Sequence, residues 1–216
     1  MHVGQINTSN VPRNVEMIQV NMTGYAQGLA AAINPDPVTG LFTDNASAPL
    51  EQGLGLRNVY KFGLYSHCAY VNETAGLCSN TSAANRFEPF SVITADMAAN
   101  FTALSNALVT NTTFTDSSYL GNFSNGAYYL LLIGTICAAL ALITGILKHT
   151  FGFLVSTLFA IVGSLMLLIG ATIWTVIIKK SIEVTIGDAL YLAWGAFGCL
   201  IASIIPYMIS CCTYRG

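Results

Sequence analysis

Three long apolar runs in the C-terminal part of the chain restrict its possible folds more than any other feature. They cover residues 127–147, 151–178 and 189–210, and none of them contains Asp, Glu, Lys or Arg. A helix needs about 20 such residues to cross a hydrocarbon layer of about 30 Å. A large soluble protein could bury one such run in its core, whereas three in series predict three transmembrane helices.

Composition supports a membrane protein and limits its partners. Only 8% of the 216 residues are charged, whereas a soluble domain usually has about 25%. Residues 1–126 hold eight of the ten acidic residues and four of the eight Lys and Arg residues. The chain has no tract rich in Lys or Arg, so we expect membrane lipids and no nucleic acid among its partners.

Glycosylation sequons indicate on which side of the membrane residues 1–126 lie. Every Asn-X-Ser/Thr sequon precedes the first apolar run. The asparagines are Asn7, Asn21, Asn45, Asn72, Asn80, Asn100, Asn111 and Asn122. N-linked glycans are added in the secretory lumen. We therefore expect residues 1–126 to form an extracellular, glycosylated domain.

The rest of the topology follows from this orientation. Residues 148–150 become a cytosolic turn, 179–188 an extracellular loop and 211–216 the start of a cytosolic tail. Lys148 agrees with the excess of positive charge on cytosolic loops, whereas Lys179 and its neighbour conflict with it. Because eight sequons lie on one side, they outweigh this conflict.

The first residues raise the question of how such a domain crosses the membrane. "MHVGQINTSN" has neither a basic start nor an apolar stretch, so it does not resemble a signal peptide. Either the run at 127–147 acts as a reverse anchor, or a further transmembrane helix precedes residue 1. We favour a preceding helix, which would give four spans.

Two cysteines in "GLYSHCAYVNETAGLC", Cys68 and Cys78, admit three interpretations. In an oxidising compartment a disulfide is the default, and it would add about 2–3 kcal/mol by restricting the unfolded chain. A metal site would need ligands such as His67 and His2, which lack zinc-type spacing. A catalytic thiol would need a partner base, and only His67 is near. The disulfide is favoured.

The pattern of residues 1–126 indicates a small mixed α/β domain. Residues 56–71 are rich in aromatic and β-branched side chains and predict strand, with 15–23 as a partner. Apolar residues at helical spacing predict one helix over 92–110, and residues 34–55 read as a loop. Because a domain of this size has a thin core, we expect it to depend on the disulfide.

These features together resemble the fungal Sur/PalI family, of the eisosome Sur-seven type, within the claudin-like superfamily. Its outer loop carries a Gly-Leu-Trp-x-x-Cys…Cys signature, which Gly63, Leu64, Cys68 and Cys78 match, with Tyr65 in place of Trp. The segment "RFEPF" and the tail "AWGAFGCLIASIIPYMISCC" extend the resemblance over nearly the whole chain. The family has four spans, and this sequence contains three.

The resemblance implies a claudin-like transmembrane helical bundle with a disulfide-bonded extracellular domain. It also implies a non-enzymatic, multi-pass protein of the fungal plasma membrane. Relatives mark eisosome-type compartments and influence the organisation of the cell wall and of endocytosis. Two alternatives remain: a PalI-type accessory of ambient-pH sensing, and a claudin-like regulator of ion or calcium influx.

Small residues recur at helical spacing within the apolar runs. Two stripes are the candidates for helix packing: Gly152, Ser156, Ala160 and Ser164 on the middle run, and Gly195, Cys199 and Ser203 on the last. Small side chains let helix backbones approach closely inside a membrane. The stripes can serve packing within one bundle, or self-association and pairing with another membrane protein, and the sequence does not separate these.

Further residues carry weaker expectations. Cys211 and Cys212 follow the last run, where palmitoylation occurs, although two idle thiols explain them equally well. Trp174 and Trp194 are expected to anchor at the membrane interface.

The sequence offers little for transport or catalysis. No ionisable residue lies inside the runs, as a transport path would need. The outer acids Glu73, Glu88 and Asp96 and the imidazole of His67 form no catalytic motif, so we expect surface groups, no enzyme activity and no cofactor.

Overall fold

The structure is a computed structural model that describes residues 16–22, 24, 27, 40–72, 75–108, 113–146, 150–180 and 184–213. The chain divides into two compact units. We call residues 1–121 with 178–187 the sheet unit, and residues 122–177 with 188–216 the helix unit. Each is described by itself.

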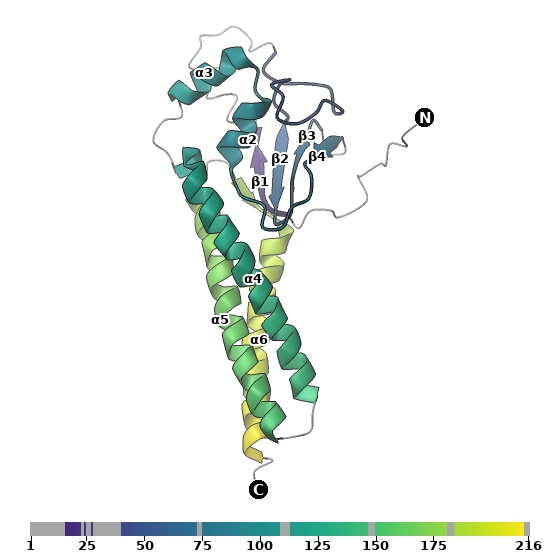
Figure 1. The fold of residues 1–216 in the computed structure, drawn as a ribbon, viewed down its shortest axis with the longest axis vertical. Coiled ribbons are helices and arrows are strands. Elements are labelled where there is room, and N and C mark those ends of the chain that lie inside the picture. Colours follow the sequence, from purple (N-terminus) through teal and green to yellow (C-terminus); the bar gives the residue numbers. More distant parts are fainter. Residues whose placement is uncertain are drawn as a thin grey trace, which may run out of the picture. The chain divides into compact units, whose positions relative to one another are not determined.

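The sheet unit contains a five-stranded antiparallel sheet (Figure 1). Its strands are β1 (Glu16–Asn21), β2 (Val59–Gly63), β3 (His67–Tyr70), β4 (Gly76–Cys78) and β5 (Val184–Ile186), in the order β4-β3-β2-β1-β5. β1 pairs with β2 on one side and with β5 on the other. The sequence predicted β1 correctly as a partner of the 56–71 stretch, but it gave no sign of β5.

The 56–71 stretch forms two strands rather than one. The chain reverses after Gly63, whose backbone N–H donates to the carbonyl of Ser66 at 3.0 Å. β2 and β3 then pair with each other, and Phe62 lies opposite His67. The aromatic-rich pattern continues through this short turn, so the pattern did not indicate where the strand ends.

The core of the sheet unit is formed by apolar side chains from strands and loops. Among its fully buried members are Ile18, Tyr60, Phe62, Phe87 and Ile93. Phe87, in the middle of "RFEPF", packs edge-on against Phe62 with ring centroids 5.1 Å apart. This motif therefore joins the sheet to the helix that follows it.

Residues 92–110 do not form the single helix that was predicted. The structure has α2 (Pro89–Asp96), α3 (Ala99–Leu108) and the 3-10 helix η2 (Thr113–Thr115). α2 starts earlier, because Pro89 stands in its first turn. Met97 has an extended backbone with ψ 138°, and its side chain is buried, so the chain turns between the two helices.

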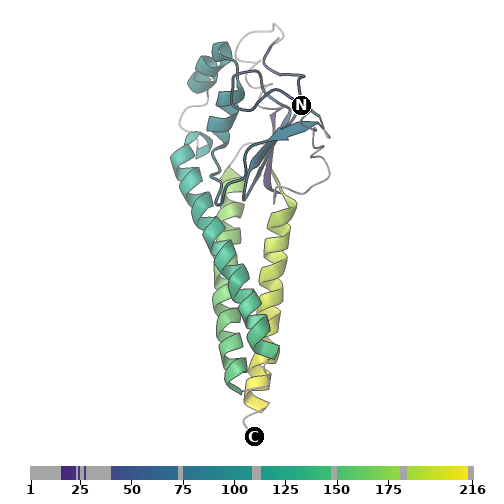
Figure 2. The ribbon, with the colours of Figure 1, turned by 45° about the vertical axis from the view of Figure 1, so that its right-hand side comes forward.

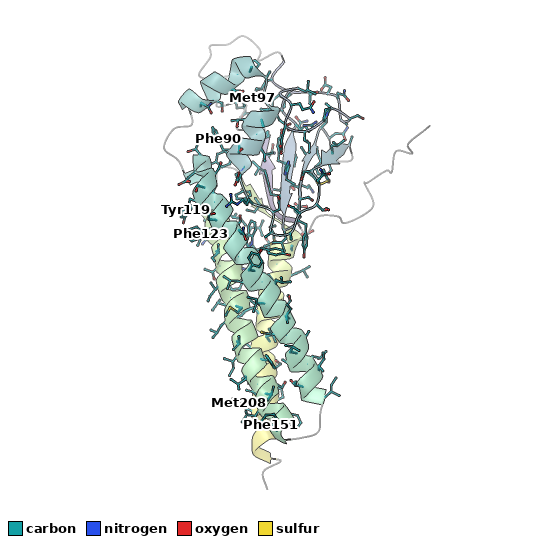
Figure 3. The ribbon with its side chains drawn as sticks, viewed as in Figure 1. Phe90, Met97, Tyr119, Phe123, Phe151 and Met208 are labelled. Carbon is teal, nitrogen blue, oxygen red and sulfur yellow. A yellow bond between two sulfur atoms is a disulfide. The ribbon has the colours of Figure 1, made fainter. Side chains whose placement is uncertain are left out.

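Three long helices follow: α4 (Ser117–Ile146), α5 (Thr150–Lys180) and α6 (Asp188–Thr213). Among the described residues, these three are long and apolar enough to cross a membrane. Figures 1 and 2 show them running alongside one another, and Figure 3 shows Phe151 of α5 and Met208 of α6 at the same end. The predicted fold class, three apolar helices with a small disulfide-bonded sheet domain, is confirmed.

α4 begins at Ser117, well before the apolar run at residue 127. Asp116 explains this start, because its Oδ1 accepts a hydrogen bond from the backbone N–H of Tyr119 at 2.8 Å. An aspartate at this position caps the first turn of a helix. Residues 147–149, which include most of the predicted cytosolic turn, lie outside the described residues.

Candidate functional site

The two cysteines of the sheet unit form a disulfide across neighbouring strands. Cys68 of β3 and Cys78 of β4 lie opposite each other in the ladder, and their sulfurs are 2.04 Å apart. The predicted bridge is therefore present. Because each sulfur is bonded to the other, neither serves as a metal ligand or as a free nucleophile.

The hairpin that carries the bridge is tight. Gly76 opens β4, and a Cβ built on it would lie 2.5 Å from Tyr70 Cδ1 and 2.6 Å from the carbonyl oxygen of Ala69. At the tip, Asn72 Oδ1 accepts a hydrogen bond from the backbone N–H of Ala75 at 2.7 Å. The segment "GLC" thus needs its glycine for the close approach of β3.

The "GLY" lead-in of the signature forms the turn between β2 and β3. The carbonyl of Leu64 accepts a hydrogen bond from the N–H of Asn85 at 3.1 Å. The carbonyl of Tyr65 accepts one from the N–H of Ser82 at 2.8 Å. Tyr65, at the position where the signature has Trp, is exposed. The signature residues therefore hold the turn against the 82–85 segment.

A buried ionic cluster lies beneath the loop before β2. Asp96, at the end of α2, accepts hydrogen bonds from Arg57 Nη1 at 2.9 Å, from the Tyr60 hydroxyl at 2.7 Å and from the backbone N–H of Glu51 at 2.5 Å. Arg57 Nη2 also donates to the carbonyl of Ala48. Burial and the neighbouring carboxylate of Asp96 raise the pKa of Tyr60. These bonds use both carboxylate oxygens to fix the loop to α2.

The expectation that Asp96 and His67 are surface groups was wrong. Both are buried. Glu88 Oε1 lies 2.8 Å from the position of a Cβ on Gly121 of the same unit, and Glu88 pairs with Arg86 at 3.6 Å. Glu73 lies outside the described residues. Asp96 and His67 each interrupt an otherwise apolar stretch, and this was the only sequence signal of their burial.

His67 and Glu51 form a second contact in the sheet unit. His67 Nε2 lies 3.3 Å from Glu51 Oε1, which is within ion-pair distance. This contact does not have the geometry of a hydrogen bond, and Nε2 has no other hydrogen-bond partner among the described residues. Burial lowers the pKa of His67, while the carboxylates of Glu51 and Asp96 partly oppose this.

The described sequon asparagines lie at exposed positions. Those with a described side chain are Asn21, Asn45, Asn72, Asn80 and Asn122. Asn100 lies in α3, and its side chain is outside the described residues, as are Asn7 and Asn111 entirely. Exposure is compatible with glycosylation, which stays a prediction.

In the helix unit, α4 and α5 pack closely through small residues. Ser156 Oγ donates to the carbonyl of Ala141 on α4 at 2.6 Å. A Cβ on Gly163 would lie 3.1 Å from Cys137 Cβ and 3.3 Å from the carbonyl oxygen of Gly134. The whole stripe named from the sequence on this helix is buried: Gly152, Ser156, Ala160 and Ser164.

Sequence reasoning did not single out Gly163 and Gly170, which also approach α4 closely. A Cβ on Gly170 would lie 3.3 Å from the carbonyl oxygen of Ala127. The two glycines are seven residues apart, which places them on one helix face. This seven-residue spacing was the signal by which the sequence could have indicated both glycines as packing residues.

α6 presents its small residues differently. Only 6% of the apolar 18-residue stretch of α6 is buried, against 22% of that of α4 and 33% of that of α5. Apart from the nearby backbone of α6 itself, no atom of the described residues lies within 4 Å of a Cβ on Gly195. Cys199 is exposed, and Ser203, half-buried, donates to the carbonyl of Leu200 in its own helix. Within the described chain this face is uncovered, so its packing role stays a prediction.

The tryptophans and the terminal cysteines complete the helix unit. Trp194 Nε1 donates to Thr175 Oγ1 at 3.3 Å and joins α6 to α5. Trp174 is buried, so it does not lie exposed at an interface as was expected. Cys211 and Cys212 lie in the last turn of α6, and their lipidation stays a prediction.

Comparison with known protein families identifies the family of this chain. The model of the SUR7/PalI family matches residues 1–206. No curated protein and no solved structure matched the chain. Among the described residues, no group of three or more His, Cys, Asp or Glu side chains could hold a metal ion.

Proposed function

Because the chain belongs to the SUR7/PalI family, a claudin-like family of membrane proteins, we propose that it is a structural protein which organises eisosome-type compartments of the fungal plasma membrane. Family membership supports either a membrane structural role or a PalI-type role. In our proposal the protein is not an enzyme, and it contributes to the interface between the cell wall and the cortex.

The observation that carries the proposal is the uncovered face of α6. The chain uses the small residues of α5 to bring two of its own helices together. The comparable residues of α6, Gly195 and Cys199, contact neither α4 nor α5 in this way. Since close contact of small residues stabilises helix pairs in membranes, this face suits lateral association with a second copy or with another membrane protein.

The extracellular location of residues 1–126 is part of the same proposal. A disulfide between β3 and β4 suits an oxidising compartment. Exposed sequon asparagines, such as Asn45 and Asn80, suit a glycosylated surface that faces the cell wall.

Imaging of Gly195→Leu in a tagged full-length chain tests the organising role. The wild-type protein should form stable membrane patches. The variant should disperse them, because leucine adds bulk to a face where a Cβ on residue 195 meets no other described part of the chain outside its own helix turn. Leu192→Ile, at an exposed position of the same helix, is the matched control and should keep the patches.

The outcome also separates the organising role from the PalI-type role. A diffuse wild-type signal, together with loss of the alkaline response on deletion of the gene, would favour the PalI-type accessory. Patches that survive in Gly195→Leu would show that α6 does not carry the association.

A further inference from the structure

Three contacts between α4 and α5 align the two helices level by level. The contacts recur every seven residues on each helix and join Ala127 to Gly170, Gly134 to Gly163 and Ala141 to Ser156. The two helices run in opposite directions with the same rise per residue. A step from Ala127 toward the start of α4 therefore matches an equal step from Gly170 toward the end of α5.

Exposed apolar side chains at one end of the helix unit fix one boundary of the hydrocarbon layer. Ile146 of α4 and Phe151 of α5, which Figure 3 labels at that end, are both exposed. Lys148, between them in the sequence, keeps its charge outside the hydrocarbon. From these residues to the contact of Ala127 with Gly170, each helix rises about 29 Å. Since a hydrocarbon layer is about 30 Å thick, its other boundary lies at that contact.

All three long helices present side chains at a level just beyond this second boundary. Asn122 and Thr175 each lie five residues past the contact, which is about 8 Å farther along the bundle. Trp194 Nε1 donates to Thr175 Oγ1 at 3.3 Å, so α6 reaches the same level. Phe123, Val176 and Trp194 are exposed there. The level therefore combines exposed apolar side chains with an amide and a hydroxyl.

A lipid headgroup layer extends about 5–8 Å beyond the hydrocarbon on each side of a bilayer. We propose that Phe123, Val176 and Trp194 form a girdle that lies in this layer. Tryptophan favours the layer, because its apolar ring and its polar edge both find partners there. In hydrocarbon the amide of Asn122 would have apolar surroundings, and in water the three apolar side chains would stay exposed. The inference goes beyond the proposed organising role and does not depend on it.

The girdle has a consequence for one of the eight sequons. Asn122 lies at the level of the girdle, so headgroups surround its side chain. Ser124, the hydroxyl residue of the same sequon, is buried. An N-linked glycan is bulky and needs a surface that faces water. We therefore expect Asn122 to carry no glycan, although its side chain is exposed.

Fluorine NMR of the full-length chain in nanodiscs tests the depth of the girdle. One sample carries 4-trifluoromethylphenylalanine in place of Phe123, and the other carries it in place of Ile136, an exposed residue near the middle of the hydrocarbon level. A spin label on the lipid headgroup should cause loss of the signal at position 123, and one at the chain end should cause loss at position 136. Loss at position 123 with the chain-end label only, or with neither label, would overturn the proposal.

Gel mobility of the glycosylated full-length chain tests the consequence for the sequon. Asn45→Gln should increase the mobility by the loss of one glycan, whereas Asn122→Gln should leave the mobility unchanged. An increase in Asn122→Gln would place this residue in water and overturn the girdle. If neither variant changes the mobility, the extracellular location of residues 1–126 fails, and the fluorine signals still decide the depth of the girdle.

Discussion

At the scale of single residues, Gly76 permits the close approach of β4 to β3. Because a Cβ there would overlap Tyr70 and the Ala69 carbonyl, we expect Gly76→Ala to lower the free energy of unfolding by about 1–3 kcal/mol. Unfolding of the purified protein in detergent measures this. Gly126→Ala is the control, because nothing lies within 4 Å of that Cβ. If both variants lost the same free energy of unfolding, the overlap of a Cβ with Tyr70 and Ala69 would not be the cause.

Asp96 makes a second prediction at this scale. Asp96→Asn leaves the buried Arg57 charge without its carboxylate, and such losses cost about 3–5 kcal/mol. Glu16→Gln removes the carboxylate from a partly exposed pair with Lys61, which is worth at most about 1 kcal/mol. The same denaturation measurement compares them. A loss in Asp96→Asn no larger than in Glu16→Gln would show that Arg57 finds another partner.

Residues differ in how much the sequence reveals about them. Cys68 and Cys78 could be paired in advance, because few alternatives exist for two cysteines in an oxidising compartment. Arg57 and Asp96 could not, because they are 39 residues apart and nothing local marks a charged side chain that will be buried. The prediction that His67 is a surface group was wrong for the same reason, because nothing in its local sequence marks the burial of its side chain.

At the scale of elements, the contact of α4 with α5 depends on Gly163. We expect Gly163→Leu to force the helices apart, because even its Cβ would press on Cys137 and on the Gly134 backbone. The thermal midpoint in detergent should fall, by an amount that corresponds to about 1–3 kcal/mol. Gly195→Leu, on the uncovered face of α6, should leave the midpoint unchanged. A fall in both variants would mean that α6 is covered within its own chain.

Long elements were predictable and short ones were not. Uncharged runs of twenty or more residues leave a helix as the only stable form in lipid, so α4, α5 and α6 follow from the sequence. The start of α4 depends on one capping side chain, Asp116. β5 has three residues, and its place beside β1 arises from a pairing between distant parts of the chain. Such a pairing leaves no local pattern.

At the scale of the whole molecule, the orientation in the membrane determines on which side of the membrane residues 1–126 lie. If residues 1–126 are extracellular, glycosidase treatment should increase the mobility of the full-length chain on a gel. Asn45→Gln and Asn80→Gln should each remove one glycan, because both side chains are exposed in loops of the sheet unit. Asn58→Gln, an exposed asparagine outside any sequon, is the control. In intact cells, an added protease should cleave this part of the chain. An unglycosylated, protected chain with free thiols at Cys68 and Cys78 would reverse the orientation and leave the sequons without a role.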